Sequence, residues 1–246
     1  MPLPPRRVLR TFKYAMYFNG VDDYVSRSMS WSGDVSVILY FRTVLSGWSV
    51  SFYDLGWSSR LFSLDYDIWR LGGIRWEQAP YIRGVVWGFW DINRNGYRVR
   101  MGIPLDTWIM VAGTNQRGVL KLYLNDSLIT QADYSAYTMN SGTGTLYIGR
   151  ESNVFIACAL VYSRALSDSE VQWNYQYPDN PIRNGLVLWL HADPQYVKDI
   201  DNDGVLEWVD LSGYNNHGKI YGAQLVELVK AAKRVLKPAR VLRAVG

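Results

Sequence analysis

The stretch VVWGFWDINRNGYRVRMGI, residues 85–103, is typical of a β-hairpin. Aromatic and β-branched residues, which favour strands, fill the runs on both sides of Asn95-Gly96. Asn-Gly readily adopts the positive φ angles of a tight hairpin turn. The stretch therefore predicts two antiparallel strands joined at this dipeptide.

Further strands are predicted on both sides of the hairpin. In residues 35–41, the alternate positions that would share one face of a strand are Val35, Val37, Leu39 and Phe41. Residues 119–124 alternate likewise, with Lys121 and Tyr123 pointing outward. Many short strands separated by turns predict an all-β, antiparallel sandwich or jelly roll.

A helix is predicted over residues 168–175, after a strand over residues 155–162. Ser167 would cap its first turn, and Glu170 would complete a capping box. A second helix is predicted over residues 224–236, where one helical face would carry Leu225, Leu228, Val229, Ala232 and Leu236. The alternative for residues 225–229 is a strand, because so short an apolar run does not distinguish the two.

The composition is that of a folded chain with a large core. Of the 246 residues, 48% are apolar and 15% are aromatic, which excludes an intrinsically disordered protein. No apolar run approaches the ~18 residues of a membrane span. The segment MPLPPRRVLR lacks the apolar region of a standard secretory signal. Cys158 is the single cysteine, so no internal disulfide can form.

Positive charge is concentrated at the two ends, although the net charge is only +4. Residues 1–13 and 230–246 contain lysine and arginine but no acidic residue, so the body between them is acidic. An acidic body argues against a groove for sequence-specific nucleic-acid binding. The basic ends could contact phosphates, lipid headgroups or an acidic neighbouring subunit, or they could be solvated tails.

The two ends also share the pattern P-x-R-V-L-R, at residues 5–10 and 238–243. One interpretation is a duplicated linker from a tandem array, through which units or protomers of a homo-oligomer join. The alternative is a chance similarity between two short segments of low complexity.

Five segments resemble one family of β-sandwich proteins in their order and spacing. They are YAMYFNGVDDYV (14–25), WIMVA (108–112), LYLN (122–125), LYIGR (146–150) and YSRALSDSE (162–170). Together they resemble the laminin-G-like, concanavalin A-like lectin/glucanase jelly rolls over residues 14–177. The resemblance implies a two-sheet antiparallel jelly-roll sandwich.

The segments that open many such proteins come last in this chain. GLV lies at residues 185–187 and DLSGYNNHG at residues 210–218, although both usually precede the F-N-G-x-D-D-Y-V strand. The order resembles a circular permutation, in which residues 179–230 complete the jelly roll of residues 14–178. They could instead complete a neighbour's jelly roll. A third possibility is that residues 179–246 form an unfinished second unit, although so short a fragment could hardly bury its own faces.

We therefore predict one jelly-roll domain over residues 14–230. The basic segments over residues 1–13 and 231–246 would flank it.

Residues 199–210, DIDNDGVLEWVD, have the spacing of a calcium-binding loop. Alternate carboxylates can converge on one hard cation, and the glycine permits a sharp turn. The predicted ligands are the side chains of Asp199, Asp201, Asp203, Glu207 and Asp210 and the carbonyl of Val205. The alternative is a polar turn between two strands, without a metal.

Tryptophan and tyrosine residues crowd into residues 48–90. Exposed rings could stack on the apolar faces of sugars while carboxylates and amides bind the hydroxyl groups, whereas buried rings would belong to the core. Trp57, which is predicted in a loop, and Trp76 beside Glu77 are the candidate carbohydrate-binding residues.

No catalytic constellation is apparent in the sequence. The related glucanases use an E-x-D-x-x-E strand, which does not occur here. Asp22 and Asp23 would point to opposite faces of a strand. His191 and His217 have no serine or cysteine placed by a motif to partner them. We therefore predict a protein that is not an enzyme.

Two functions remain open. The first is a lectin-like module that binds surface glycans for adhesion or host recognition, with or without calcium. The second is a structural subunit of a virion or assembly whose jelly roll contacts only protein.

The arginine preference and the PARVLR segment are similar to those of proteins from hyperthermophilic archaea and their viruses, where such domains can lie on virion surfaces. We therefore expect a virion-surface or extracellular location. The expected partners are surface glycans and virion or cell-surface proteins.

Overall fold

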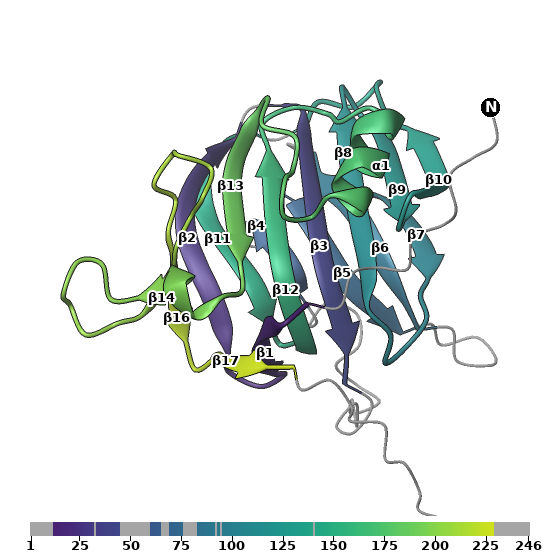
Figure 1. Ribbon diagram of the computed structural model, residues 1–246. Helices are drawn as coiled ribbons and strands as arrows, with labels where there is room; N and C mark the ends of the chain where they lie inside the picture. The colour runs from purple at the N-terminus through teal and green to yellow at the C-terminus, as the bar shows by residue number, and fades with distance from the viewer. Residues whose placement is uncertain are drawn as a thin grey trace, which may run out of the picture.

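Two antiparallel β-sheets pack face to face in the computed structural model (Figure 1). The structure describes residues 12–31, 33–44, 60–64, 69–75, 83–91, 93, 95–139 and 141–228. The first sheet contains β1 (Tyr14–Asn19), β3 (Val35–Thr43), β8 (Ile109–Gln116), β9 (Val119–Leu124), β10 (Ser127–Asp133), β12 (Asn153–Tyr162), β13 (Leu186–His191) and β17 (Gln224–Glu227). The second contains β2 (Tyr24–Trp31), β4 (Arg60–Leu64), β5 (Trp69–Arg75), β6 (Arg83–Trp90), β7 (Gly96–Gly102), β11 (Gly142–Arg150), β14 (Val197–Lys198), β15 (Glu207–Trp208) and β16 (Gly218–Tyr221).

The strand order confirms the predicted jelly-roll sandwich. The first sheet runs β10-β9-β8-β3-β12-β1-β17, and β13 pairs with β12. The second runs β14-β15-β16-β2-β11-β4-β5-β6-β7. Neighbouring strands in both sheets are thus often far apart in the sequence.

The predicted hairpin over residues 85–103 is confirmed as β6 and β7, but its turn differs from the prediction. Gly96 already lies in β7, where it pairs with Trp90. Asp91 closes the connection, because its Oδ1 atom accepts hydrogen bonds from the backbone nitrogens of Asn93 (2.9 Å) and Asn95 (2.8 Å). An aspartate side chain that binds the backbone two residues on is a common turn device. The connection is therefore longer than a two-residue Asn-Gly turn.

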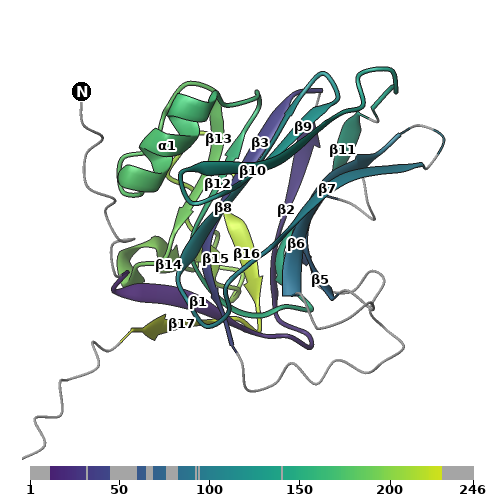
Figure 2. The same cartoon turned by 90° about the vertical axis from the view of Figure 1, so that its right-hand side faces the viewer.

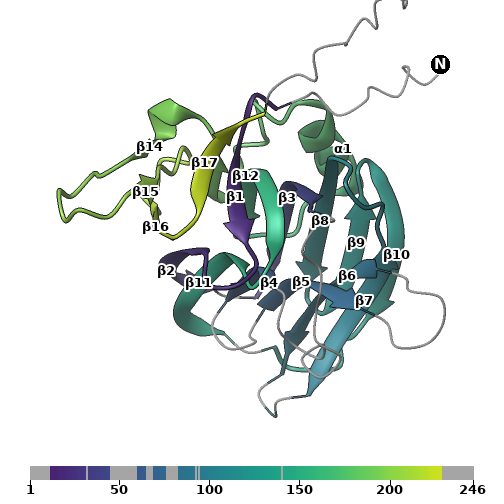
Figure 3. The same ribbon diagram turned by 90° about the horizontal axis from the view of Figure 1, so that it is seen from below.

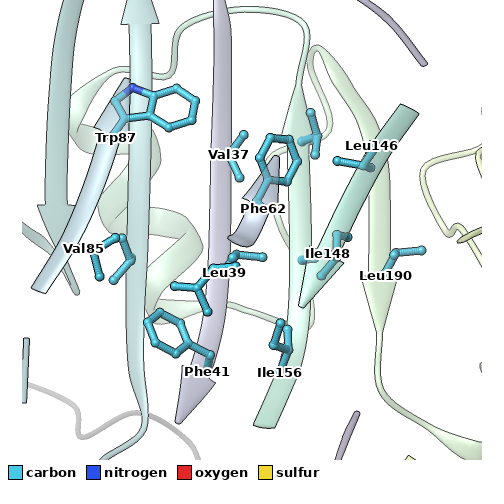
Figure 4. Close-up of a cluster of buried hydrophobic side chains, with 14 of the residues drawn as sticks. Val37, Leu39, Phe41, Phe62, Val85, Trp87, Leu146, Ile148, Ile156 and Leu190 are labelled. Atoms are coloured by element: carbon cyan, nitrogen blue, oxygen red, sulfur yellow. The ribbon is translucent and has the colours of Figure 1, made fainter. Parts of the chain in front are cut away.

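The main core lies between the two sheets, as Figure 4 shows. β3 contributes the four residues predicted to share one face, Val35, Val37, Leu39 and Phe41. From the second sheet, Phe62 and Trp87 fill the space opposite. The Trp87 Nε1 atom donates a hydrogen bond to the carbonyl of Thr114 (3.0 Å), so the polar atom of this buried ring is satisfied.

Helix α1 (Asp168–Gln176) covers the outer face of the first sheet (Figure 2). Its predicted capping box is confirmed, with Ser167 as the N-cap and Glu170 at the third helical position. Lys121 and Tyr123 point away from the main core as predicted. Tyr123 is nevertheless buried, because α1 covers this face of the sheet, and its hydroxyl group donates a hydrogen bond to Asp168 of α1 (2.8 Å).

The C-terminal strands join both sheets of the same chain. β13 pairs with β12 and β17 with β1 in the first sheet, and β16 pairs with β2 in the second. Figure 3 shows β17 beside β1. Leu188, Leu190 and Trp208 are buried in the same core as β3. The strands between Leu186 and Glu227 therefore belong to the two sheets of the sandwich. A short 3-10 helix, η2 (Pro194–Tyr196), precedes β14.

The second predicted helix is wrong where the structure describes it. Residues 224–227 form strand β17, in which Leu225 pairs with Met16 and Glu227 with Tyr14. The edge of β1 offers backbone hydrogen-bond partners to these residues, and tertiary context decides such short apolar runs. Residues 229–236 lie outside the described residues. Within the described ranges, no helix has the length and apolar character needed to cross a lipid bilayer.

Candidate functional site

A cavity of about 340 Å³ lies beside β2, where this strand extends past its neighbour. β16 pairs with Tyr24, Val25 and Ser26 of β2, and the strand then continues to Trp31. The cavity walls come from this continuation, from β11 and β13, and from the turn over residues 210–217. In Figure 1 this turn rises beside the end of β2. The cavity therefore lies where the edges of the two sheets approach each other.

Strand alternation determines what β2 and β11 contribute to the cavity. Ser28 and Ser30 are exposed on the outer face of β2, whereas Met29 and Trp31 point toward the core. The hydroxyl groups of Ser30 and Thr143 lie 2.7 Å apart and form a hydrogen bond across the two strands. The Trp31 ring packs edge-on against Phe62, with the ring centroids 6.0 Å apart. This side of the cavity thus combines hydroxyl groups with the Trp31 ring.

Asp210, which the sequence had suggested as a metal ligand, holds the turn that forms the opposite wall. Its buried carboxylate accepts hydrogen bonds from the backbone nitrogens of Trp189 (2.8 Å), Ser212 (2.9 Å) and Asn216 (2.9 Å) and from the Ser212 hydroxyl group (2.7 Å). The Asn216 side chain donates to the carbonyl of Val187 (2.8 Å). The turn is therefore fixed to β13.

The turn presents Tyr214, a residue that lines the cavity and is 64% exposed. Asp34 lines the same cavity from the connection between β2 and β3, and its Oδ1 atom accepts a hydrogen bond from the backbone nitrogen of Arg117 (2.7 Å). Of the described residues, Asp34 is the only charged one that lines the cavity. An open aromatic ring, hydroxyl groups, an amide and one carboxylate together suit a small polar ligand with apolar faces.

The acidic loop, residues 199–207, projects from the sandwich between β14 and β15 (Figure 1). Pairing of Lys198 with Glu207 closes its base, so side-chain oxygens of Asp199, Asp201 and Glu207 come within 4.8 Å of one another. The Asp199 Oδ2 atom accepts a hydrogen bond from the backbone nitrogen of Gly204 (3.0 Å). Its Oδ1 atom is buried without a hydrogen-bond partner. These three carboxylates therefore fit the oxygen ligands that calcium prefers.

Two other predicted ligands are engaged elsewhere. Lys219 of β16 forms ion pairs with Asp203 and with Asp201 (3.2 Å to Asp201). Hydrogen bonds to Asp203 and Asp201 raise the pKa of Lys219, and the bond from Lys219 lowers the pKa of Asp203. Asp210 lies apart from the cluster, in the turn described above. The structure thus brings together three of the predicted carboxylates and places a lysine on the loop.

The backbone nitrogen of Val205, whose carbonyl was the sixth predicted ligand, donates a hydrogen bond to Asp203 (2.9 Å). This bond holds Asp203 in its turn beside Lys219.

The predicted carbohydrate-binding residues Trp57, Trp76 and Glu77 lie outside the described residues. Sequence reasoning missed Trp31, Asp34 and Tyr214. Tyr214 could have been found, because an aromatic residue in the glycine- and asparagine-containing turn DLSGYNNHG is exposed more often than one in a strand. Nothing in the sequence indicated that this turn meets β2.

Comparison with known proteins gives one family match. The family model described as the concanavalin A-like lectin/glucanases superfamily matches residues 46–172, which is more than half of the chain. No curated protein matches the sequence.

Solved structures share the fold at low sequence identity. A Bacteroides ovatus protein to which carbohydrate binding has been ascribed has a TM-score of 0.63 and 14% identity, over 89% of this chain and 61% of that chain. The binding domain of botulinum neurotoxin serotype D has a TM-score of 0.50 and 16% identity, over 92% of this chain and 66% of that chain.

The binding domain of Paraclostridial Mosquitocidal Protein 1 also has a TM-score of 0.50 and 16% identity, over 71% of this chain and 47% of that chain. The present chain spans less than two thirds of each of these three relatives.

Proposed function

Because this chain belongs to the concanavalin A-like lectin/glucanases superfamily, we propose that it is a non-catalytic module that binds carbohydrate in the cavity beside β2. Two of these structural relatives are binding domains, and carbohydrate binding has been ascribed to the third. Fold alone does not give function, so the composition of the cavity carries the proposal.

The supporting observation is Tyr214, an exposed ring that lines a cavity with hydroxyl, amide and carboxylate groups on its other walls. A sugar ring has apolar C–H faces that can pack on an aromatic ring, and its hydroxyl groups can bond to serine, asparagine and aspartate. The volume of about 340 Å³ lies at the lower end of the range for small-ligand sites. The cavity therefore suits one end of a glycan.

A glycan array with the full-length protein tests this proposal. We expect Tyr214→Ala to abolish most of the binding, because the mutation removes the stacking surface. Tyr177→Ala is the matched control, since Tyr177 is 40% exposed at the end of α1 and does not line the cavity. If the Tyr214→Ala variant bound as well as wild type, the cavity would not be the site. If no glycan bound, the carbohydrate-binding function would be refuted.

We further propose that the acidic loop binds one calcium ion through Asp199, Asp201 and Glu207. The unpartnered Oδ1 atom of Asp199 supports this, because a cation would satisfy it. Calcium would have to compete with Lys219 for Asp201. Isothermal titration with CaCl₂ should give a single site that Asp199→Asn removes.

Asp126→Asn, on the β9–β10 turn, is the control for this titration and should leave the site intact. The glycan array repeated in EDTA then shows whether sugar binding depends on the metal. If titration of the wild-type protein with CaCl₂ gave no binding heat, the calcium site would be refuted and the proposed carbohydrate site would be unaffected.

We also propose adhesion to a glycan-bearing surface as the use of this binding, at a virion surface or outside the cell. Binding of labelled protein to intact cells should then fall after glycosidase treatment. A protein that binds no glycan but forms oligomers of one defined size would instead favour the assembly subunit.

A further inference from the structure

Three tyrosines cluster on the outer face of the second sheet, at the end of β2 away from the cavity. The rings of Tyr24 and Tyr221 are stacked with their centroids 4.7 Å apart, and Tyr147 meets Tyr24 edge-on at 5.6 Å. Tyr221 is 39% exposed. The Arg150 guanidinium lies over the Tyr147 ring, 4.9 Å from its centroid. The main core lies on the opposite side of this sheet, so these rings face away from it.

A row of small hydroxyl-bearing side chains connects this cluster to the cavity. Alternation places Ser26, Ser28 and Ser30 on the same face of β2 as Tyr24. The residues paired with them on β11 are Tyr147, Thr145 and Thr143. Ser28, Ser30 and Thr143 also line the cavity. The cavity and the tyrosine cluster are therefore two ends of one continuous surface.

We propose that this surface binds one extended oligosaccharide, whose end enters the cavity and whose chain runs along β2 to the tyrosine cluster. The inference rests on the proposed carbohydrate-binding function and adds the ligand class, a glycan chain in place of a single terminal sugar. The seven residues from Tyr24 to Ser30 span roughly 20 Å at the usual rise of a strand. A ligand that uses both ends must therefore contain several sugar residues.

The chemistry along this path fits such a chain. Serine and threonine hydroxyl groups both donate and accept hydrogen bonds, so they can pair with sugar hydroxyl groups in several orientations. Their small size lets a ligand approach the sheet closely. The tyrosine rings at the far end offer a stacking surface. Continuity of the hydroxyl row with the cavity favours an extended glycan over a second copy of the chain, because a protein partner does not require a path that ends in a cavity.

Chain-length dependence of the affinity tests the inference. Oligosaccharides of increasing length, built on a glycan that the protein binds, would be titrated against wild type and Tyr221→Ala. We expect the wild-type affinity to rise until the chain reaches the cluster. The Tyr221→Ala variant should bind long chains about 3- to 10-fold more weakly and short chains unchanged, because one stacking contact is lost.

Tyr17→Ala is the matched control. Tyr17 forms a cross-strand ring pair with Phe155 (5.1 Å) on the outer face of the first sheet, so its loss should change neither affinity. Tyrosine nitration, mapped by mass spectrometry on the wild-type protein, gives a second readout that needs no mutant. Long oligosaccharides should protect Tyr221, whereas short ones should not.

The outcomes separate the inference from the proposed function. If affinity did not depend on chain length and Tyr221 stayed reactive in saturated protein, the extended site would be overturned while the cavity site stood. If no oligosaccharide of any length bound, the carbohydrate-binding function itself would fail. Self-association that buries Tyr221 in the absence of glycan would assign the cluster to a second copy and would also overturn the inference.

Discussion

The replacement of Asp210 by alanine should destabilise the protein severely, in calcium and in EDTA alike. The Asp210 side chain is 6% exposed and accepts four hydrogen bonds. Alanine would leave the buried backbone nitrogen of Trp189 without an acceptor, which costs about 1–3 kcal/mol. The backbone nitrogens of Ser212 and Asn216 are only partly buried, so water can replace part of what they lose. Together these losses predict a decrease of roughly 3–5 kcal/mol in the free energy of unfolding.

Urea unfolding followed by tryptophan fluorescence measures this change, with Asp199→Ala as the matched control. Asp199 lies in the projecting loop, so its replacement should alter the free energy of unfolding by less than about 1 kcal/mol in EDTA. An Asp210→Ala variant as stable as wild type would refute the assigned hydrogen-bond network. A destabilisation seen only in calcium would show that Asp210 acts as a metal ligand instead.

Three further predictions concern the fold. Deletion of residues 179–246 should expose the edges of β2 and β12 and leave an aggregating protein, whereas a soluble truncation with a cooperative thermal transition would contradict this. Hydrogen bonds from Arg164 lower the pKa of Glu170 to about 2 from its usual 4.5. This carboxylate should therefore stabilise the fold above pH 4.5 and lose that effect as the pH falls toward 2. Glu170→Gln should flatten this part of the profile of stability against pH, and an unchanged profile would count against the ion pair. Gly113→Ala would place a methyl group 2.4 Å from the Trp87 ring. This should lower the free energy of unfolding in urea by about 1–3 kcal/mol, and a neutral effect would mean that the Trp87 ring shifts to accommodate the methyl group.

Local patterns in the sequence were sufficient to predict elements that depend on interactions within a short segment. The capping box at Ser167 and Glu170 satisfies backbone groups within one helical turn, so α1 could be placed from sequence alone. The alternation of residues 35–41 fixed which side chains of β3 face the core. The hairpin of β6 and β7 was predicted correctly, although its turn was not.

Local patterns in the sequence could not show contacts with distant partners. Residues 224–227 have apolar positions compatible with either a helix or a strand, and the free edge of β1 selects the strand. Asp210 fits a calcium-loop spacing, but the spacing does not show that its carboxylate accepts hydrogen bonds from backbone N–H groups of β13 and of its own turn. Lys219 is not part of the acidic motif, and only the pairing of β15 with β16 brings it to Asp201 and Asp203.

Local patterns were enough to predict an all-β sandwich, the capped helix and the core-facing residues of β3, because these depend on periodicity and on contacts within a few residues. The tertiary structure alone decided the candidate binding surface. Trp31 and Tyr214 are 183 positions apart in the chain. They line one cavity because β16 pairs with β2 and the turn over residues 210–217 lies beside this strand. Strand pairing between distant segments depends on hydrogen-bond partners and core volume that no local pattern encodes.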